Sequence, residues 1–149
     1  MMPADARSLT GQQLGAYQLE AHLAIGGLAE CFKAYHVELR REVAVILLPG
    51  SLVGGRETLA ALRDETRRIS ALKHPNILPL YGIAETQDIL YAVTPLPAES
   101  LRDQLDREDL LAAARAVRLA AQLAWALHAL HGIGLVHGDV QPGMLLFDA

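Results

Sequence analysis

A run of six apolar residues, Val43 to Leu48, stops at Pro49-Gly50 and leaves little choice of structure for this part of the chain. An apolar run of this length between turn signals predicts a central strand that is buried on both faces of a sheet. Two other stretches with strand character precede it, separated by Gly26-Gly27 and by a polar turn. We therefore expect three consecutive strands at residues 17–23, 31–35 and 42–48.

The segment that follows changes from a strand pattern to a helix pattern. Apolar residues recur among charges over residues 57–72, which predicts an amphipathic helix. Pro75 favours its end, because the residue before a proline resists helical backbone angles. Two more strands are expected at 77–83 and 89–94. The prolines within 95–97 then stop sheet pairing, since proline has no N–H to donate.

The remainder of the chain is predicted to be mainly helical. A short helix is expected at 100–105, and a long one at 110–131 is apolar almost all round, which is typical of a buried helix. Residues 135–148 are expected to form a loop and a short strand pair. Five strands with one inserted helix, followed by further helices, indicate an α+β fold.

Composition excludes several classes of protein. The 149 residues carry a net charge of −4, which gives no reason to expect a nucleic-acid partner. A single cysteine, Cys31, excludes an intrachain disulfide framework. The first ten residues lack the apolar stretch of a signal peptide, and polar residues interrupt the apolar segment 116–136 too often for a membrane span. We expect a soluble, cytoplasmic protein that contacts neither nucleic acid nor membrane.

Three short motifs, in this order and spacing, carry a resemblance to a known family. They are the lead-in Gly11 to Tyr17, then His74-Pro75-Asn76-Ile77, and then His137 to Pro142 (His-Gly-Asp-Val-Gln-Pro). The order resembles that of a eukaryotic-type protein kinase domain of the bacterial Ser/Thr kind, whose catalytic loop usually reads His-Arg-Asp-x-Lys-Pro.

This resemblance implies a kinase-like small lobe, with a five-stranded antiparallel sheet and one helix, and then the start of a truncated large lobe. It divides the chain into an N-terminal extension (1–15), the small lobe (16–94), a hinge (95–99) and the first helices and catalytic-loop region of the large lobe (100–149).

The phosphate-covering loop of the family, Gly-x-Gly-x-x-Gly, falls on residues 24–29, where only Gly26 stands at a pattern position. Glycine allows the backbone to approach phosphate closely, and a Cβ crowds that approach. Gly26 and Gly27 are therefore candidates for a weakened phosphate loop, or for a plain β-turn.

The resemblance places the strand lysine of the family, which contacts the nucleotide phosphates, at Ile46. Isoleucine offers neither charge nor donor. Glu65 matches the glutamate that would hold this lysine, so it is expected to pair with Arg68 or another arginine, or to face water. Cys31 and Ala44 are expected in the vestigial nucleotide pocket; for Cys31, simple packing is the other interpretation.

At the hinge, Thr94 matches the residue at the back of the nucleotide pocket, and Leu96 belongs to the segment that contacts adenine. Pro97 matches a position whose N–H normally contacts adenine, and proline has none.

In the catalytic loop, Asp139 matches the base that accepts the substrate proton. Gln141 replaces a lysine and Met144 replaces the asparagine that holds magnesium, although magnesium prefers hard oxygen ligands. His137 is expected to pack inside and to contact backbone.

The resulting hypothesis is a degenerate, pseudokinase-like module without phosphotransferase activity, which binds magnesium and ATP weakly or not at all and has no metal site. It would act, if at all, through a protein partner or a second copy bound at the apolar helix 110–131. Trp125, within this helix, is expected to pack in the core.

Two alternatives stay open. One is the N-terminal part of a Ser/Thr kinase that retains weak ATP binding, with Lys33 as a relocated lysine or simply a solvated one. The other is a fragment with no activity of its own.

Overall fold

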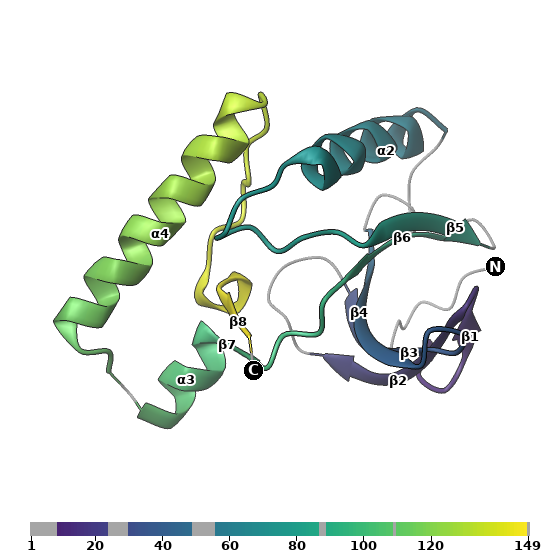
Figure 1. Cartoon of the computed structure of the whole chain (residues 1–149), viewed down its shortest axis with the longest axis horizontal. Helices are drawn as coiled ribbons and strands as arrows, with labels where there is room; N and C mark the ends of the chain where they lie inside the picture. The colour runs from purple at the N-terminus through teal and green to yellow at the C-terminus, as the bar shows by residue number, and fades with distance from the viewer. Residues whose placement is uncertain (1–8, 24–29, 49–55, 87–88, 109, 149) are drawn as a thin grey trace.

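The computed structural model describes residues 9–23, 30–48, 56–86, 89–108 and 110–148. Figure 1 shows a curled sheet with one helix beside it, and two further helices set apart on the other side of the molecule. The elements in chain order are β1 (Gln13–Leu14), β2 (Tyr17–Leu23), β3 (Glu30–His36), β4 (Arg41–Leu47), α2 (Arg56–Ala71), β5 (Gly82–Thr86), β6 (Ile89–Thr94), β7 (Glu99–Ser100), α3 (Leu101–Glu108), α4 (Ala113–Gly132), a 3-10 turn (Pro142–Met144) and β8 (Leu146–Phe147).

The main sheet is antiparallel and has the strand order β1-β2-β3-β4-β6-β5. The predicted α+β class is confirmed, and strands 17–23 and 89–94 have the predicted bounds. The expectation of five strands was wrong, because the short β1 adds a sixth. Gly15 closes the β1–β2 turn with a φ of 59°, and a Cβ at this position would lie 2.7 Å from the Tyr91 hydroxyl oxygen.

The hydrophobic core lies on one face of this sheet. Its members are buried to 7% exposure or less and come from β2, β3, β4 and β6 together with the segment before them: Leu9, Leu14, Leu19, Phe32, Ala34, Val43, Val45, Leu47, Ile89, Tyr91 and Val93. The apolar run at 43–48 thus forms a central strand, as predicted, with β3 on one side and β6 on the other. Leu9 and Leu14 belong to the predicted N-terminal extension, so part of that segment is integral to the core.

Helix α2 covers the predicted amphipathic segment and contacts the edge strand β5. Thr66 is buried on its inner side, and its hydroxyl donates to the Leu62 carbonyl at 2.6 Å. Arg63 pairs with Glu85 of β5. The contact with β5 and this ion pair therefore hold the helix against the sheet.

The prediction of a strand at 77–83 was wrong for most of its length. β5 begins only at Gly82, although the Tyr81 N–H already donates to the Val93 carbonyl at 2.7 Å. Pro79 has no N–H for a ladder, and Ile77 and Leu78 line a cavity between the two parts of the molecule instead.

Helix α3 begins with reciprocal capping bonds. The Ser100 hydroxyl oxygen accepts the Asp103 N–H at 3.3 Å, while the Asp103 carboxylate accepts the Ser100 N–H and hydroxyl, both at 2.7 Å. This arrangement satisfies otherwise free N–H groups at the helix start. The hydroxyl and then the backbone N–H of Ser100 lower the pKa of Asp103.

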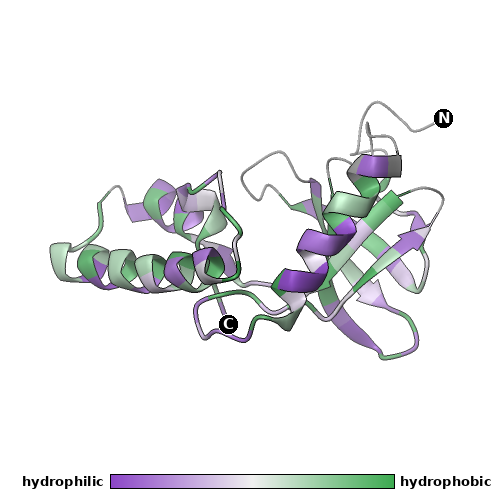
Figure 2. Cartoon of the chain, turned by 90° about the horizontal axis from the view of Figure 1, so that it is seen from above, coloured by the Kyte–Doolittle hydropathy of each residue, from purple (hydrophilic) through white to green (hydrophobic). Residues whose placement is uncertain are grey.

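Helix α4 is long, as predicted, but it is not buried all round. Ala126 and Leu130 are its buried residues, while Val117 is 68% exposed and Trp125 is 56% exposed. The expectation that Trp125 packs inside was therefore wrong, although its ring contacts His74 edge-on at 4.5 Å between centroids. In Figure 2, green hydrophobic segments recur along the whole of α4. No described helix is both long and apolar enough to cross a membrane.

The C-terminal strand β8 pairs with β7, at the start of α3, with Glu99 opposite Phe147. The expected strand pair within 135–148 was wrong, since the partner strand comes from the hinge side of the chain. This pairing fastens the catalytic-loop-like segment to α3.

Candidate functional site

The predicted pocket residues of the sheet lie together on the face opposite the core. In the strand register, Cys31 lies opposite Ile46, which lies opposite Ala92. Ala44 lies opposite Thr94 in the same way. Cys31, Ala44 and Thr94 are exposed by only 1–2%, and burial raises the pKa of the Cys31 thiol to about 12. These three buried side chains are therefore uncharged where the predicted nucleotide pocket begins.

Ile46 is half-buried in the middle of this face, between Cys31 and Ala92. All three side chains lack a cationic group. A phosphate brought to this position would find no charge from these residues to neutralise it.

The register places Lys33 on this same face, opposite Ala44, and its ammonium is already paired. Its ammonium lies 2.5 Å from a Glu42 carboxylate oxygen and 3.6 Å from a Glu20 carboxylate oxygen. The hydrogen bond to Glu42 is the main cause that raises its pKa. The geometry favours the interpretation of Lys33 as a surface lysine over a relocated phosphate ligand.

Glu65 on α2 is exposed and forms no ion pair with any residue that the structure describes. Of the two options given by the sequence, facing water is the one observed. Arg68 instead donates to the carbonyl of Ile133, just after α4. This bond joins α2 to the second part of the molecule.

The hinge borders a cavity of about 160 Å³. Leu23 lines it from the sheet and Leu146 from the catalytic-loop side, with Pro97, Ala98, Glu99, Ser100 and Asp103 between them. Leu96 is half-buried next to these residues in the chain, and the Thr94 hydroxyl donates to the Pro95 carbonyl at 3.1 Å.

Both ionisable groups of this hinge cavity are acidic. Hydrogen bonds from Arg107 and then Gln104 lower the pKa of Glu99, and the bonds from Ser100 lower the pKa of Asp103. Both carboxylates are therefore ionised near neutral pH. Glu99 is paired with Arg107, so the negative charge that disfavours an anionic ligand in this cavity comes mainly from Asp103.

Asp139 is exposed, and the side-chain amide of Gln141 donates to both of its carboxylate oxygens at 3.0 Å. The Asp139 N–H donates to His137 Nδ1 at 3.2 Å. The predicted backbone contact of His137 is confirmed, but its predicted burial was wrong, because the side chain is exposed. Asp139, at the predicted base position, and Gln141, at the position of the family lysine, are thus hydrogen-bonded to each other.

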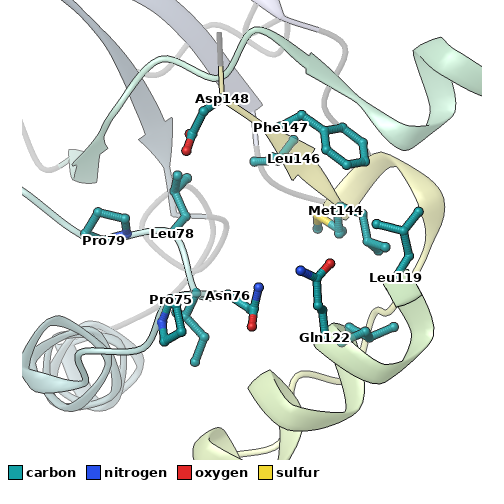
Figure 3. Close-up of a pocket in the computed structure, with 13 residues that line it drawn as sticks. Pro75, Asn76, Leu78, Pro79, Leu119, Gln122, Met144, Leu146, Phe147 and Asp148 are labelled. Atoms are coloured by element: carbon teal, nitrogen blue, oxygen red, sulfur yellow. The ribbon is translucent and has the colours of Figure 1, made fainter. Parts of the chain in front are cut away.

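Met144 lines a second cavity, of about 360 Å³, between the segment after α2 and the inner side of α4. Figure 3 shows Asn76 and Gln122 near its centre, with Asp148 at one end. Among the residues that the structure describes, no three His, Cys, Asp or Glu side chains are grouped so as to hold a metal ion. Gly26 and Gly27 lie outside the described residues.

Reasoning from the sequence missed several residues of the hinge cavity, among them Leu23 and Leu146. Leu23 directly precedes the glycine-containing loop, and Leu146 follows Met144 by two positions. The signal for Leu23 was available, since the residue before such a loop ends a strand at the pocket. Leu146 needed the β7–β8 pairing, which the sequence does not indicate.

Comparisons with known proteins agree with this geometry. A family model described as the protein kinase domain matches residues 17–149. The chain is 30% identical to the serine/threonine-protein kinase pkn3 of Myxococcus xanthus over 99% of this chain and 28% of that protein. It is 30% identical to the serine/threonine-protein kinase PknE of Mycobacterium tuberculosis, over 99% of this chain and 26% of that protein.

The match to the serine/threonine-protein kinase PrkC of Bacillus subtilis is also 30% identical and covers 94% of this chain and 22% of that relative. The chain thus spans about a quarter of the length of these curated relatives. From its motifs, its fold and the extent of the family match, the chain belongs to the protein kinase domain family.

Proposed function

We propose that this chain is a kinase-derived protein-interaction module that does not transfer phosphate. The observation that carries the proposal is the bond pair between the Gln141 amide and both carboxylate oxygens of Asp139. In phosphoryl transfer, the aspartate accepts a proton from the substrate hydroxyl. A neutral amide at position 141 holds this acceptor and supplies no positive charge for the moving phosphoryl group.

The residues around the predicted pocket do not fit magnesium and ATP. Ile46 and its two register partners carry no charge, and Lys33 is held by two glutamates. The hinge cavity presents Asp103, whose carboxylate opposes a polyphosphate. Met144 offers a soft thioether where magnesium requires oxygen. Loss of one charge-stabilising donor commonly lowers a rate by about a hundred- to a thousandfold.

The exposed side chains of α4 support the interaction role. Val117 and Trp125 are more than half exposed, and Leu110 just before the helix is 82% exposed. Each large apolar side chain that leaves water contributes roughly 1.5–3 kcal/mol. Contiguous exposed apolar residues mark binding surfaces.

The alternative of weak ATP binding is supported by the hinge cavity. Leu23 from the sheet and Leu146 from the catalytic-loop side both line this cavity. A thermal-shift titration of the full chain with magnesium-ATP discriminates between the two proposals. We expect no saturable shift at millimolar nucleotide. A saturable shift would support the alternative.

Phosphotransfer itself is tested with γ-labelled ATP and a generic protein acceptor. The chain and its Asp139→Asn variant should give the same background incorporation. Incorporation that is lost in Asp139→Asn would show that the aspartate acts as a base and would end the proposal.

A further inference from the structure

The side of α4 opposite its buried residues Ala126 and Leu130 carries few charged side chains. Ala121 is nine residues before the buried Leu130, which at 100° per residue places the two on opposite sides of the helix. We call the exposed residues around Ala121 the outer face of α4. Its members are Ala114, Val117, Arg118, Ala121, Ala124, Trp125 and His128, all of them exposed.

The outer face has almost no charge. Arg118 is its one charged member at neutral pH, and residues 110–138 contain neither Asp nor Glu. The other two described helices differ, since α2 exposes Glu57, Asp64, Glu65 and Arg67, and α3 exposes Arg102, Asp106, Arg107 and Glu108. Charged side chains would lose their hydration against an apolar surface. Among the described helices, the surface that matches the outer face of α4 is therefore α4 itself.

The outer face is also arranged symmetrically about Ala121. Val117 and Trp125 stand four residues on either side of it, Ala114 and His128 seven, and Arg118 and Ala124 three. In an antiparallel pair of such helices, a two-fold axis through Ala121 brings each residue against its counterpart. His128 and Arg118 then meet alanines, which leave space for them, and Val117 meets Trp125.

We propose that two copies of this chain associate through the outer faces of α4, antiparallel, with a two-fold axis at Ala121. This inference rests on the proposed interaction role and names a second copy as the partner. An isologous contact of this kind closes on itself and forms a dimer.

The geometry at the axis permits close contact. Helix axes pack about 8–10 Å apart and each Cα lies about 2.3 Å from its axis, so the two Ala121 Cα atoms would be separated by roughly 3.5–5.5 Å. A helix of 20 residues is about 30 Å long. The buried area therefore falls at the small end of specific interfaces, where weak and transient complexes lie.

Sedimentation equilibrium on the full chain tests the association directly. Val117→Asp should raise the dissociation constant at least tenfold, because two carboxylates would be buried per dimer. Leu39→Asp is the matched control, since Leu39 is 58% exposed in the turn between β3 and β4. It should leave the dissociation constant unchanged. Far-ultraviolet circular dichroism verifies that both variants are folded.

Cysteine cross-linking tests the register. Ala121→Cys should form a disulfide-linked dimer under mild oxidation, because the expected Cα separation overlaps the 4.4–6.8 Å of disulfides. Val37→Cys, 50% exposed on the other part of the molecule, measures cross-linking by random collision. The native Cys31 is buried, so its contribution to the background is small.

We expect Ala121→Cys to cross-link at least tenfold faster than Val37→Cys. Equal rates, or a monomer at 200 μM chain, would overturn the proposed dimer. Neither result would affect the absence of phosphotransfer, which is measured separately with γ-labelled ATP. Labelled-phosphate incorporation by a dimeric chain would instead end the proposed function and leave the dimer in place.

Discussion

The two parts of this molecule bury their apolar residues to very different degrees. In the sheet, Phe32, Val43 and Val45 are fully buried within one cluster. In α4, Ala126 and Leu130 are buried, but Val117 and Trp125 are mostly exposed. The sheet closes around its own core, because a curled antiparallel sheet covers one of its faces by itself. A single long helix cannot do so.

The buried residues of the sheet are needed for folding, whereas the exposed residues of α4 are available for binding. The core face of the sheet is fixed by packing, whereas the outer face of α4 is exposed, although its Trp125 ring contacts His74. The opposite face of the sheet, with Cys31 and Ala44, carries Ile46 where the resemblance places a lysine.

The comparison predicts the largest loss of stability from the core of the sheet. Phe32→Ala should lower the free energy of unfolding by about 3–5 kcal/mol, because it removes a fully buried aromatic side chain and leaves a cavity. Urea denaturation followed by circular dichroism measures the change. Val136→Ala, at a position that is 81% exposed, should change the stability little. Similar losses for the two variants would show that the sheet does not hold the main core.

A smaller loss is expected on the opposite face of the sheet. Ile46→Lys should lower the free energy of unfolding by about 1–3 kcal/mol, because a half-buried polar group would gain no partner from Cys31 or Ala92. It should not restore phosphotransfer, since Met144 and Gln141 remain. Ile46→Met is the matched control for size. Incorporation of labelled phosphate by the Ile46→Lys chain would contradict our interpretation of the site.

The strands could be predicted where local pattern and packing agree. β2 and β6 were found with their bounds because each is a compact strand-forming segment ended by turn or proline signals. Residues 77–81 share the apolar composition of a strand, yet Pro79 prevents pairing and the apolar side chains line a cavity. Composition alone does not distinguish an apolar segment that forms a strand from one that lines a cavity.

For the candidate site, the sequence indicates which residues share a face of the sheet, but it does not indicate which side chains are in contact. Register brings Cys31, Ala44 and Thr94 to one face of the sheet, where the resemblance places a nucleotide pocket. The bond between Gln141 and Asp139 depends on side-chain conformations in an exposed loop. The exposure of Trp125 depends on which neighbours are present around α4. Neither can be derived from residue spacing.

The start of α3 should show an intermediate effect. Ser100→Ala removes the hydroxyl that accepts the Asp103 N–H and should lower the free energy of unfolding by about 1 kcal/mol. Thermal denaturation at neutral pH measures it. Ser70→Ala, whose hydroxyl donates within the exposed side of α2, is the matched control and should have a smaller effect.

The capping bonds also predict a dependence on pH. Because the folded-state pKa of Asp103 is lowered, its stabilising contribution is present above the unfolded pKa of about 3.9 and is lost as pH falls through the folded pKa. The difference in stability between the native chain and Asp103→Asn should therefore shrink below pH 4. A difference that grows as the pH falls would contradict this assignment.

The smallest effect is expected at Lys33. Its ion pairs with Glu42 and Glu20 are partly exposed, and such pairs are screened by salt. Lys33→Met should change the thermal midpoint by less than Ser100→Ala does, and 0.5 M salt should reduce the change further. The pKa of Lys33 is raised, so its contribution is present below the unfolded pKa and is lost as pH rises through the folded value.

The same variant separates the two interpretations of Lys33. If the lysine only pairs with Glu42 and Glu20, Lys33→Met and native chain respond identically to magnesium-ATP in a thermal-shift titration. A relocated phosphate ligand requires a saturable response in the native chain that disappears in Lys33→Met. Arg102→Met, on the exposed side of α3, removes the same charge and is the control for net charge. Loss of a nucleotide response in Lys33→Met alone would show that the sheet face opposite the core binds nucleotide. That face and the outer face of α4 would then both be binding surfaces, and they would differ only in the ligand that each one binds.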